Sequence, residues 1–216
     1  MLVNFKNTTY LDFNTFSVYV AHIPPAMISQ LLAESKILPQ PLQERIKQRQ
    51  LNHDKAASIQ AWLLLKEYLL TQSLHHQDLL HNIQFSPQGK PSFSETDCKL
   101  YFNFSHSHEK IICAISHTHQ IGVDIEKVMP FDTQILNEYF DLNEQQFISQ
   151  ANVPMEAFYT LWTKKEAFIK CTGEGITKKD LATINVLQKN IVLDEQPYIF
   201  HSINVGYGYV ANVCIY

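Results

Sequence analysis

Two short stretches of the sequence decide the fold, IGVDIEKV at 121–128 and WTKKEAFIKCTG at 162–173. In the first, apolar residues recur at every second position, which is the period of a β-strand and places Asp124 and Glu126 on one face. In the second, residues of like character recur every three or four positions, which is the period of an α-helix. We therefore expect a strand and a helix with charged side chains at regular spacing.

A tryptophan and two charged residues of the predicted helix lie on a single stripe. Trp162, Glu166 and Lys170 are four residues apart and so lie one above the other. Glu166 adds a third carboxylate to the two on the strand, and oxygen ligands of this kind favour Mg2+, which fills its remaining positions with water and phosphate. The pattern indicates phosphate chemistry. An exposed acidic pair on the strand and an i, i+4 surface pair on the helix are the alternatives.

Gly122 is expected on the same strand face as the two carboxylates. Glycine is unfavourable inside a strand unless something approaches its backbone closely. We interpret it as leaving room for a bulky anion beside the carboxylates.

The composition describes a globular chain. Of its 216 residues 45% are hydrophobic and 12% aromatic, which is enough for one domain of upper size or two small halves. A net charge of −4 argues against a general nucleic-acid binder. The four cysteines form no CxxC pair, and the first residues lack the basic start and apolar run of a secretion signal. The apolar runs are too short to span a membrane, so we expect a soluble protein of the cytoplasm.

The order of strands and helices occurs twice along the chain. Alternation and turn residues predict strands at 16–23, 83–85, 100–104, 111–116, 121–127, 184–186, 191–193, 198–200 and 207–215. Helical spacing predicts helices at 26–35, 41–49, 54–72, 132–150 and 155–171. We therefore predict an α+β fold of two similar halves, 1–117 and 118–216, with a cleft between them.

Residues 105–108 read SHSH and are interpreted as a polar break after a strand. They offer hydroxyl and imidazole donors for phosphate, or they form a turn that caps itself. The His-x-His pairs at 106/108 and 117/119 lack the further spaced ligands of a zinc site. The sequence contains no Gly-x-Ser-x-Gly elbow, phosphate-binding Walker loop or dinucleotide-binding Gly-x-Gly-x-x-Gly.

Four motifs in a fixed order resemble those of the 4′-phosphopantetheinyl transferase superfamily. They are GKP at 89–91, NFSHS at 103–107, GVDIE at 122–126, and WTKKEA at 162–167 with Lys170. The length resembles the long, monomeric, surfactin-type branch. That resemblance implies a pseudo-twofold pair of α+β halves with coenzyme A bound at their junction.

Carried over by position, the resemblance assigns three groups of site residues. Mg2+, or Mn2+ in its place, would be held by Asp124, Glu126 and Glu166. Coenzyme A would be bound by Lys90, Pro91, Ser105, His106, Lys170, Arg45 and Arg49. The residues implied in catalysis are Glu166, Lys170 and His106. The chain departs from the family at 58–62, which reads SIQAW where many members have a Ser-x-x-Gly-Arg-like run, so an arginine contact is lost.

The implied reaction transfers 4′-phosphopantetheine from coenzyme A to a serine of an apo acyl or peptidyl carrier protein and releases adenosine 3′,5′-bisphosphate. Glu166 or a water that it orients would accept the serine proton. A Mg2+-dependent phosphoester hydrolase and a non-catalytic module that binds coenzyme A or a carrier are the alternatives. We also predict that Lys164, Lys165, Lys178 and Lys179 help to seat an acidic carrier, although a solvated charge run is an equal interpretation.

Overall fold

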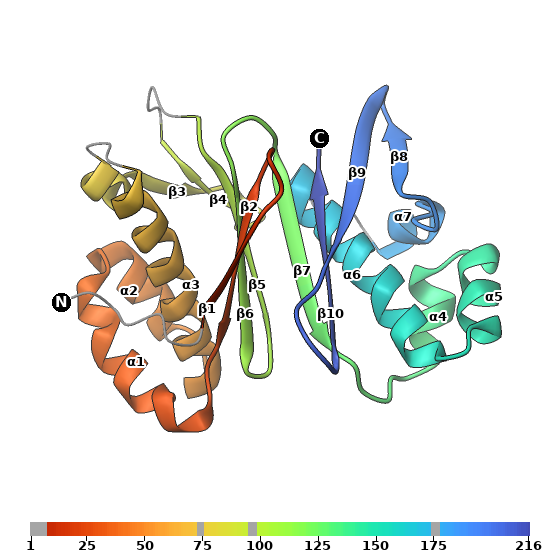
Figure 1. Ribbon diagram of the computed structural model, residues 1–216, viewed down its shortest axis with the longest axis horizontal. Coiled ribbons are helices and arrows are strands. Elements are labelled where there is room, and N and C mark those ends of the chain that lie inside the picture. Colours follow the sequence, from red (N-terminus) through yellow and green to blue (C-terminus); the bar gives the residue numbers. More distant parts are fainter. Residues whose placement is uncertain (1–7, 73–75, 95–98, 174–177) are drawn as a thin grey trace.

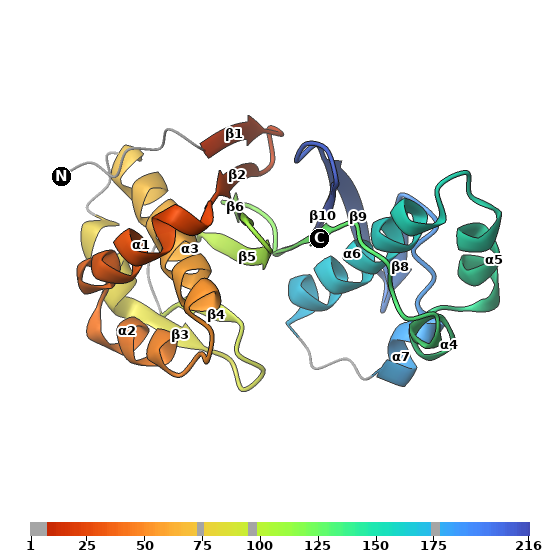
Figure 2. The same ribbon diagram turned by 90° about the horizontal axis from the view of Figure 1, so that it is seen from below.

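Two four-stranded antiparallel sheets form the middle of the molecule, and helices cover both outer sides (Figure 1). The computed structural model describes residues 8–72, 76–94, 99–173 and 178–216. Turned by 90°, the molecule shows the helices of the first half on one side and those of the second half on the other (Figure 2). This arrangement agrees with the predicted α+β class.

The first sheet has the strand order β1-β2-β6-β5. Its strands are β1 (Thr8–Asp12), β2 (Ser17–His22), β5 (Tyr101–Ser107) and β6 (Lys110–Ser116). A separate hairpin consists of β3 (Ile83–Phe85) and β4 (Pro91–Phe93). The helices of this half are α1 (Ile28–Glu34), α2 (Gln40–Lys47) and α3 (Asn52–Thr71), with 3-10 turns η1 (Pro25–Met27), η2 (Ser35–Ile37) and η3 (His76–Asn82). Helix α3 has buried residues on all its faces, because it packs between α1 and β6.

The second sheet has the strand order β7-β10-β9-β8. Its strands are β7 (Ile121–Lys127), β8 (Asn190–Leu193), β9 (Gln196–Ile203) and β10 (Tyr209–Ile215). The helices are α4 (Gln134–Tyr139), α5 (Leu142–Gln150), α6 (Pro154–Thr172) and α7 (Lys178–Thr183). Pro154 opens α6, where a missing N–H costs nothing, and Gly173 ends it with φ 68.

The apolar inner faces of the two sheets share one core. It contains buried residues of β2 and β6 from the first sheet and of β7, β9 and β10 from the second. Two further cores lie between each sheet and its own helices. The halves are therefore held together largely by apolar burial, which is proportional to the area removed from water.

Side chains, rather than a backbone ladder, connect β5 to β7 in the described part of the chain. Alternate residues of β5, namely Asn103, Ser105 and Ser107, all bond to β7. Asn103 Oδ1 accepts the N–H of Val123 at 3.0 Å. This polar seam brings β7 and its carboxylates against the first half.

Two predicted elements are wrong. The polar break at 105–108 does not begin until His108, whose φ is 52, because Ser105 and Ser107 continue β5 and bond to β7. The predicted strand at 184–186 is irregular in the structure. Residues of this segment form hydrogen bonds with side chains of the α5 region and not with a neighbouring strand. Strands β1 and β4 were not predicted, since neither has a clear alternating pattern.

The interpretation of Gly122 is also wrong. A Cβ on this residue would lie 2.1 Å from the carbonyl oxygen of Ala167 and 2.3 Å from the backbone nitrogen of Cys171. Helix α6 therefore occupies the space that we assigned to an anion. The glycine is required because the helix backbone lies directly on the strand.

In the described parts of the chain, none of the helices combines the length and the apolar content that crossing a membrane requires.

Candidate active site

A cavity of about 440 Å³ lies where the two halves meet. Residues of α2, α3, the turn before β4, strand β5 and the end of α6 line it. The lining includes every residue that the sequence assigned to coenzyme A: Arg45, Arg49, Lys90, Pro91, Ser105, His106 and Lys170. The fold therefore brings together residues that are up to 125 positions apart in the chain, from Arg45 to Lys170.

A triangle of polar contacts closes the inner end of the cavity. Asp124 Oδ1 accepts hydrogen bonds from Ser105 Oγ at 2.8 Å and from Lys170 Nζ at 2.7 Å. Lys170 Nζ also donates to Ser105 Oγ at 3.1 Å. The three side chains come from β7, β5 and α6, so the triangle joins both halves. Asp124 is 3% exposed, and its Oδ2 has no hydrogen-bond partner within the described residues.

Two more carboxylates, those of Glu126 and Glu166, lie close enough to Asp124 for their charges to interact with it. Burial, with a further contribution from Asp124, raises the pKa of Glu126 to about 7. A hydrogen bond of 2.8 Å from Ser107 Oγ to Glu126 Oε2 opposes that rise. Burial and then Asp124 likewise raise the pKa of Glu166, and Lys170 opposes the effect. At neutral pH the cluster therefore favours a proton or another cation.

The residues present fit a hard divalent cation. Throughout the described residues, no three acidic, histidine or cysteine side chains converge into a complete metal cage. Mg2+ does not need one, because it commonly takes one or two carboxylates and leaves the remaining positions to water and phosphate. Such a cation would give the unpartnered Oδ2 of Asp124 a partner. It would also stabilise the charged form of Glu126, which burial now disfavours.

Lys90 fastens the end of α6 to the first half. Its Nζ donates to the carbonyl oxygen of Cys171 at 2.6 Å and to Gln120 Oε1 at 3.2 Å. A Cβ on Gly173 would lie 2.8 Å from Lys90 Cδ, so the glycine lets the lysine stem pass. Burial lowers the pKa of Lys90. The sequence predicted a coenzyme contact here, whereas this structural tie between the halves was missed.

The departure at 58–62 shapes the wall of the cavity. Ser58 and Trp62 both line it. The Trp62 ring packs edge-on against Phe104, with ring centroids 4.9 Å apart. No arginine lies on this part of α3. Within the described lining the guanidinium groups come from Arg45 in α2 and from Arg49 just after it, and that of Arg45 stacks 4.1 Å over the ring of Phe85.

His106 lies on the same wall and has a partner that the sequence did not indicate. Its Nε2 is 3.5 Å from Asp54 Oδ1, in the first turn of α3. Burial lowers the pKa of His106, the charge of Arg49 lowers it further, and Asp54 opposes both effects.

Residues 120–202 match the family model described as the 4′-phosphopantetheinyl transferase superfamily. The matched range contains β7 and α6, and with them all three carboxylates of the cluster. Over this range, which is less than half of the chain, the sequence is similar to the 4′-phosphopantetheinyl transferase superfamily.

Curated 4′-phosphopantetheinyl transferases are similar to about half of the chain. The chain is 33% identical over 126 residues to 4′-phosphopantetheinyl transferase gsp of Aneurinibacillus migulanus, which covers 57% of this chain and 51% of that protein. It is 37% identical over 120 residues to psf-1 of Bacillus pumilus, covering 53% and 51%. It is 36% identical over 100 residues to Sfp of Bacillus subtilis, covering 44% of each. The chain thus spans about half the length of the curated relatives that it matches.

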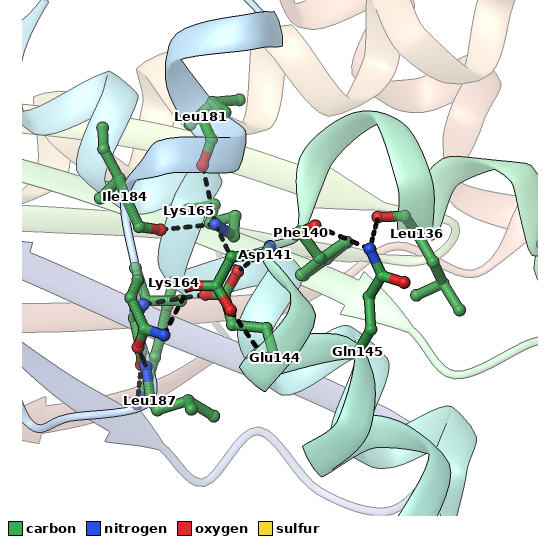
Figure 3. A network of polar contacts seen from close by, with 12 residues as sticks. Leu136, Phe140, Asp141, Glu144, Gln145, Lys164, Lys165, Leu181, Ile184 and Leu187 are labelled. Carbon is green, nitrogen blue, oxygen red and sulfur yellow. Dashed lines mark hydrogen bonds and ion pairs between the residues drawn. The ribbon is translucent and has the colours of Figure 1, made fainter.

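The phosphopantetheinyl transferase motif also contains Lys164 and Lys165, and the prediction that they face a carrier is wrong. Lys165 is 1% exposed, and its Nζ lies 2.8 Å from Glu144 Oε2. It also donates to the carbonyl oxygen of Leu181, within α7, and to that of Ile184, just after α7 (Figure 3). Lys164 is half-buried and donates to backbone carbonyls in the segment after α7. The side chains of Lys178 and Lys179 lie outside the described residues.

Glu144 is the centre of the network in Figure 3. It belongs to a capping box, in which Asp141 Oδ1 accepts the N–H of Glu144 and Glu144 Oε2 accepts the N–H of Asp141. Glu144 Oε1 accepts the N–H of Val186 at 2.9 Å, and Asp141 Oδ2 accepts Asn185 Nδ2 at 2.6 Å. The network holds α5, α6 and the chain after α7 together.

Proposed function

We propose that the protein transfers the 4′-phosphopantetheine group from coenzyme A to a serine of an apo acyl or peptidyl carrier protein. One observation carries the proposal: the cavity between the halves has arginines in its wall, and two of its lining residues, Ser105 and Lys170, bond to the buried carboxylate of Asp124. Such a cavity suits a ligand with phosphates along its length, because cationic groups bind the phosphates and the acidic end holds a cation. We also propose that the halves divide at 1–117 and 118–216.

The cationic residues would bind and orient the coenzyme. Arg45 and Arg49 supply guanidinium groups that pair with phosphate in two-pronged geometry, and they are our candidates for its 3′-phosphate. Lys170 is 28% exposed at the cavity, so it can contact a phosphate while it bonds to Asp124. Lys90, Pro91, Ser105 and His106 complete the proposed binding set.

Asp124, Glu126 and Glu166 would hold Mg2+ or Mn2+. When bound, the ion neutralises charge on the pyrophosphate and so stabilises the departing adenosine 3′,5′-bisphosphate. Asp124 supports this assignment best, since its free oxygen is buried beside the cavity lining residues Ser105 and Lys170.

Glu166 would accept the proton of the carrier serine, directly or through a water that it orients. The serine oxygen bonds to the phosphorus that carries pantetheine, and the bond from that phosphorus to the bisphosphate breaks. A carboxylate that also holds the cation is a weak base, so we favour the water that Glu166 orients as the proton acceptor.

Mass spectrometry of an apo carrier protein incubated with the purified protein, Mg2+ and coenzyme A tests the proposal. We expect the carrier to gain the roughly 340 Da of a phosphopantetheine group attached covalently to its serine. The Asp124→Asn protein is the matched control and should form the adduct far more slowly. An unmodified carrier would refute the transferase, and phosphopantetheine released from coenzyme A in the absence of carrier would indicate a hydrolase instead.

The proposed setting is a monomer in the cytoplasm. Among the described residues, Cys113, Cys171 and Cys214 are free and buried, which suits a reducing compartment.

A further inference from the structure

We propose that Asp54 is a positioning residue, which pairs with the imidazole of His106 and orients it on the cavity wall toward an anionic phosphate of the coenzyme. The role of His106 as a phosphate contact rests on the proposed function. The pairing of the two side chains does not, and it can be measured without any transferase assay.

The geometry of the pair joins two elements that form the cavity. Asp54 lies in the first turn of α3, and His106 lies in β5. His106 Nε2 and Asp54 Oδ1 are 3.5 Å apart, with side chains 30% and 34% exposed. A carboxylate in the first turn of a helix is favoured by the helix dipole, so Asp54 is well placed to remain a fixed anion. The ring of His106, which lines the cavity, is thereby tied to the helix layer.

Asp54 opposes the effects that disfavour the cationic form of His106. Burial, Arg49 and His53 all lower the pKa of His106. Asp54 raises this pKa, because its carboxylate faces the ring at 3.5 Å and stabilises the positive charge. Arg49 and His106 both line the same cavity, so without Asp54 the two cationic groups would repel each other there. Asp54 therefore permits both to face one anionic ligand.

This role explains why the pair is half-exposed at a cavity rather than sealed in a core. A purely structural ion pair would hold α3 to β5, and its loss would change stability without changing how the affinity for coenzyme A depends on pH. A positioning pair changes that dependence. The His106 cation is lost as pH rises through its pKa, and removal of Asp54 moves this loss to lower pH.

The first experiment follows the ring signals of His106 by NMR from acid to alkaline pH, without coenzyme. We expect Asp54→Asn to lower the pKa of His106 and Asp54→Glu to restore it toward the wild-type value. Glu109→Gln is the matched control, because Glu109 pairs with His22 at 3.0 Å on the exposed surface. It should leave the His106 titration unchanged. An unchanged titration in Asp54→Asn would overturn the proposal.

The second experiment measures KM for coenzyme A and KM for the carrier at several pH values. Asp54→Asn should raise KM for coenzyme A about two- to five-fold at mildly acidic pH, where the wild-type ring carries its charge; this is the range that a half-exposed ion pair contributes. The rise of this KM with pH should begin at lower pH than in wild type, while KM for the carrier stays unchanged. Equal pH profiles for wild type and Asp54→Asn would overturn the proposal. Failure of the wild type to modify any carrier would instead refute the proposed function, since the NMR result stands by itself.

Discussion

Helix α6 carries two lysine–carboxylate pairs that are nearly equal in length and opposite in environment. Lys165 Nζ lies 2.8 Å from Glu144 Oε2, and Lys170 Nζ lies 2.7 Å from Asp124 Oδ1. The first pair is sealed, with side chains 1% and 0% exposed. The second opens on the cavity, where Lys170 is 28% exposed.

The two pairs also differ in how completely they are satisfied. Lys165 has three acceptors, and both oxygens of Glu144 accept hydrogen bonds. Asp124 instead keeps one buried oxygen with no partner in the described structure. A buried charge pair is tolerable only when its remaining bonds are made. We infer that the sealed pair holds the fold, whereas the open pair is kept incomplete for a ligand.

The largest effect that we expect comes from breaking the sealed pair. Lys165→Met should destabilise the protein by about 3–5 kcal/mol, because it leaves Glu144 charged and buried without its partner. Urea unfolding followed by circular dichroism measures the change. The double variant Glu144→Gln/Lys165→Met should recover part of the loss. Lys170→Met is the comparison, and it should cost roughly 1 kcal/mol, because Lys170 is partly solvated. If Lys165→Met and Lys170→Met lost equal stability, the distinction between a structural pair and an open pair would be refuted.

The next effect concerns activity at the open pair. Asp124→Asn keeps the size of the side chain and removes its charge, so the fold should survive while carrier modification falls about 100- to 1000-fold, as when one preorganised electrostatic group is removed. Initial rates of adduct formation measure the fall, and the far-ultraviolet spectrum checks the fold. Wild-type turnover by this variant would refute the assigned role of Asp124.

A smaller expected effect is that Glu126 makes the stability of the protein depend on pH. The folded pKa of Glu126 is about 7, above its usual 4.5, so the folded state binds more protons between these values and stability falls as pH rises through that window. Glu126→Gln should remove this fall and gain about 1–2 kcal/mol at pH 8, after a discount for solvent screening. Thermal unfolding from pH 5 to 8 with chelator measures it. Parallel pH curves for the variant and wild type would contradict the assignment.

The smallest effect is expected at the carrier side. Reversing the charges of Lys178 and Lys179 should raise KM for an acidic carrier a few-fold at low salt, because these charges would act mainly by steering. Raising the salt concentration should remove the difference. A carrier KM that does not respond at low salt would support the interpretation as a solvated charge run.

Local periodicity was sufficient to predict the elements that carry the site. Alternation in 121–127 and helical spacing in 155–171 correspond to β7 and α6 in the structure. The family resemblance, rather than periodicity, selected the residues that line the cavity. Ser105 and Ser107 show that a signal was present and misinterpreted, since polar residues at a two-residue period can continue a strand whose neighbour satisfies them.

Contacts between distant parts of the chain could not be predicted. Lys164 and Lys165 look like an exposed basic run until α5 and the segment after α7 enclose them. Gly122 indicated that another group lies close to the strand, but only the structure shows that this group is the backbone of α6. Asp54 and His106 are 52 positions apart with no shared motif, so only the fold reveals their pairing.

The strand order of the two sheets has a consequence for how the chain could be divided. Strands β1, β2, β5 and β6 end at Ser116, and strands β7 to β10 begin at Ile121, so a cut between these residues interrupts no sheet. Each fragment would expose an apolar sheet face that only the other covers. The protein is therefore suited to fragment complementation: Ser105 meets Asp124 only after reassembly, so recovered activity would report that the fragments have joined.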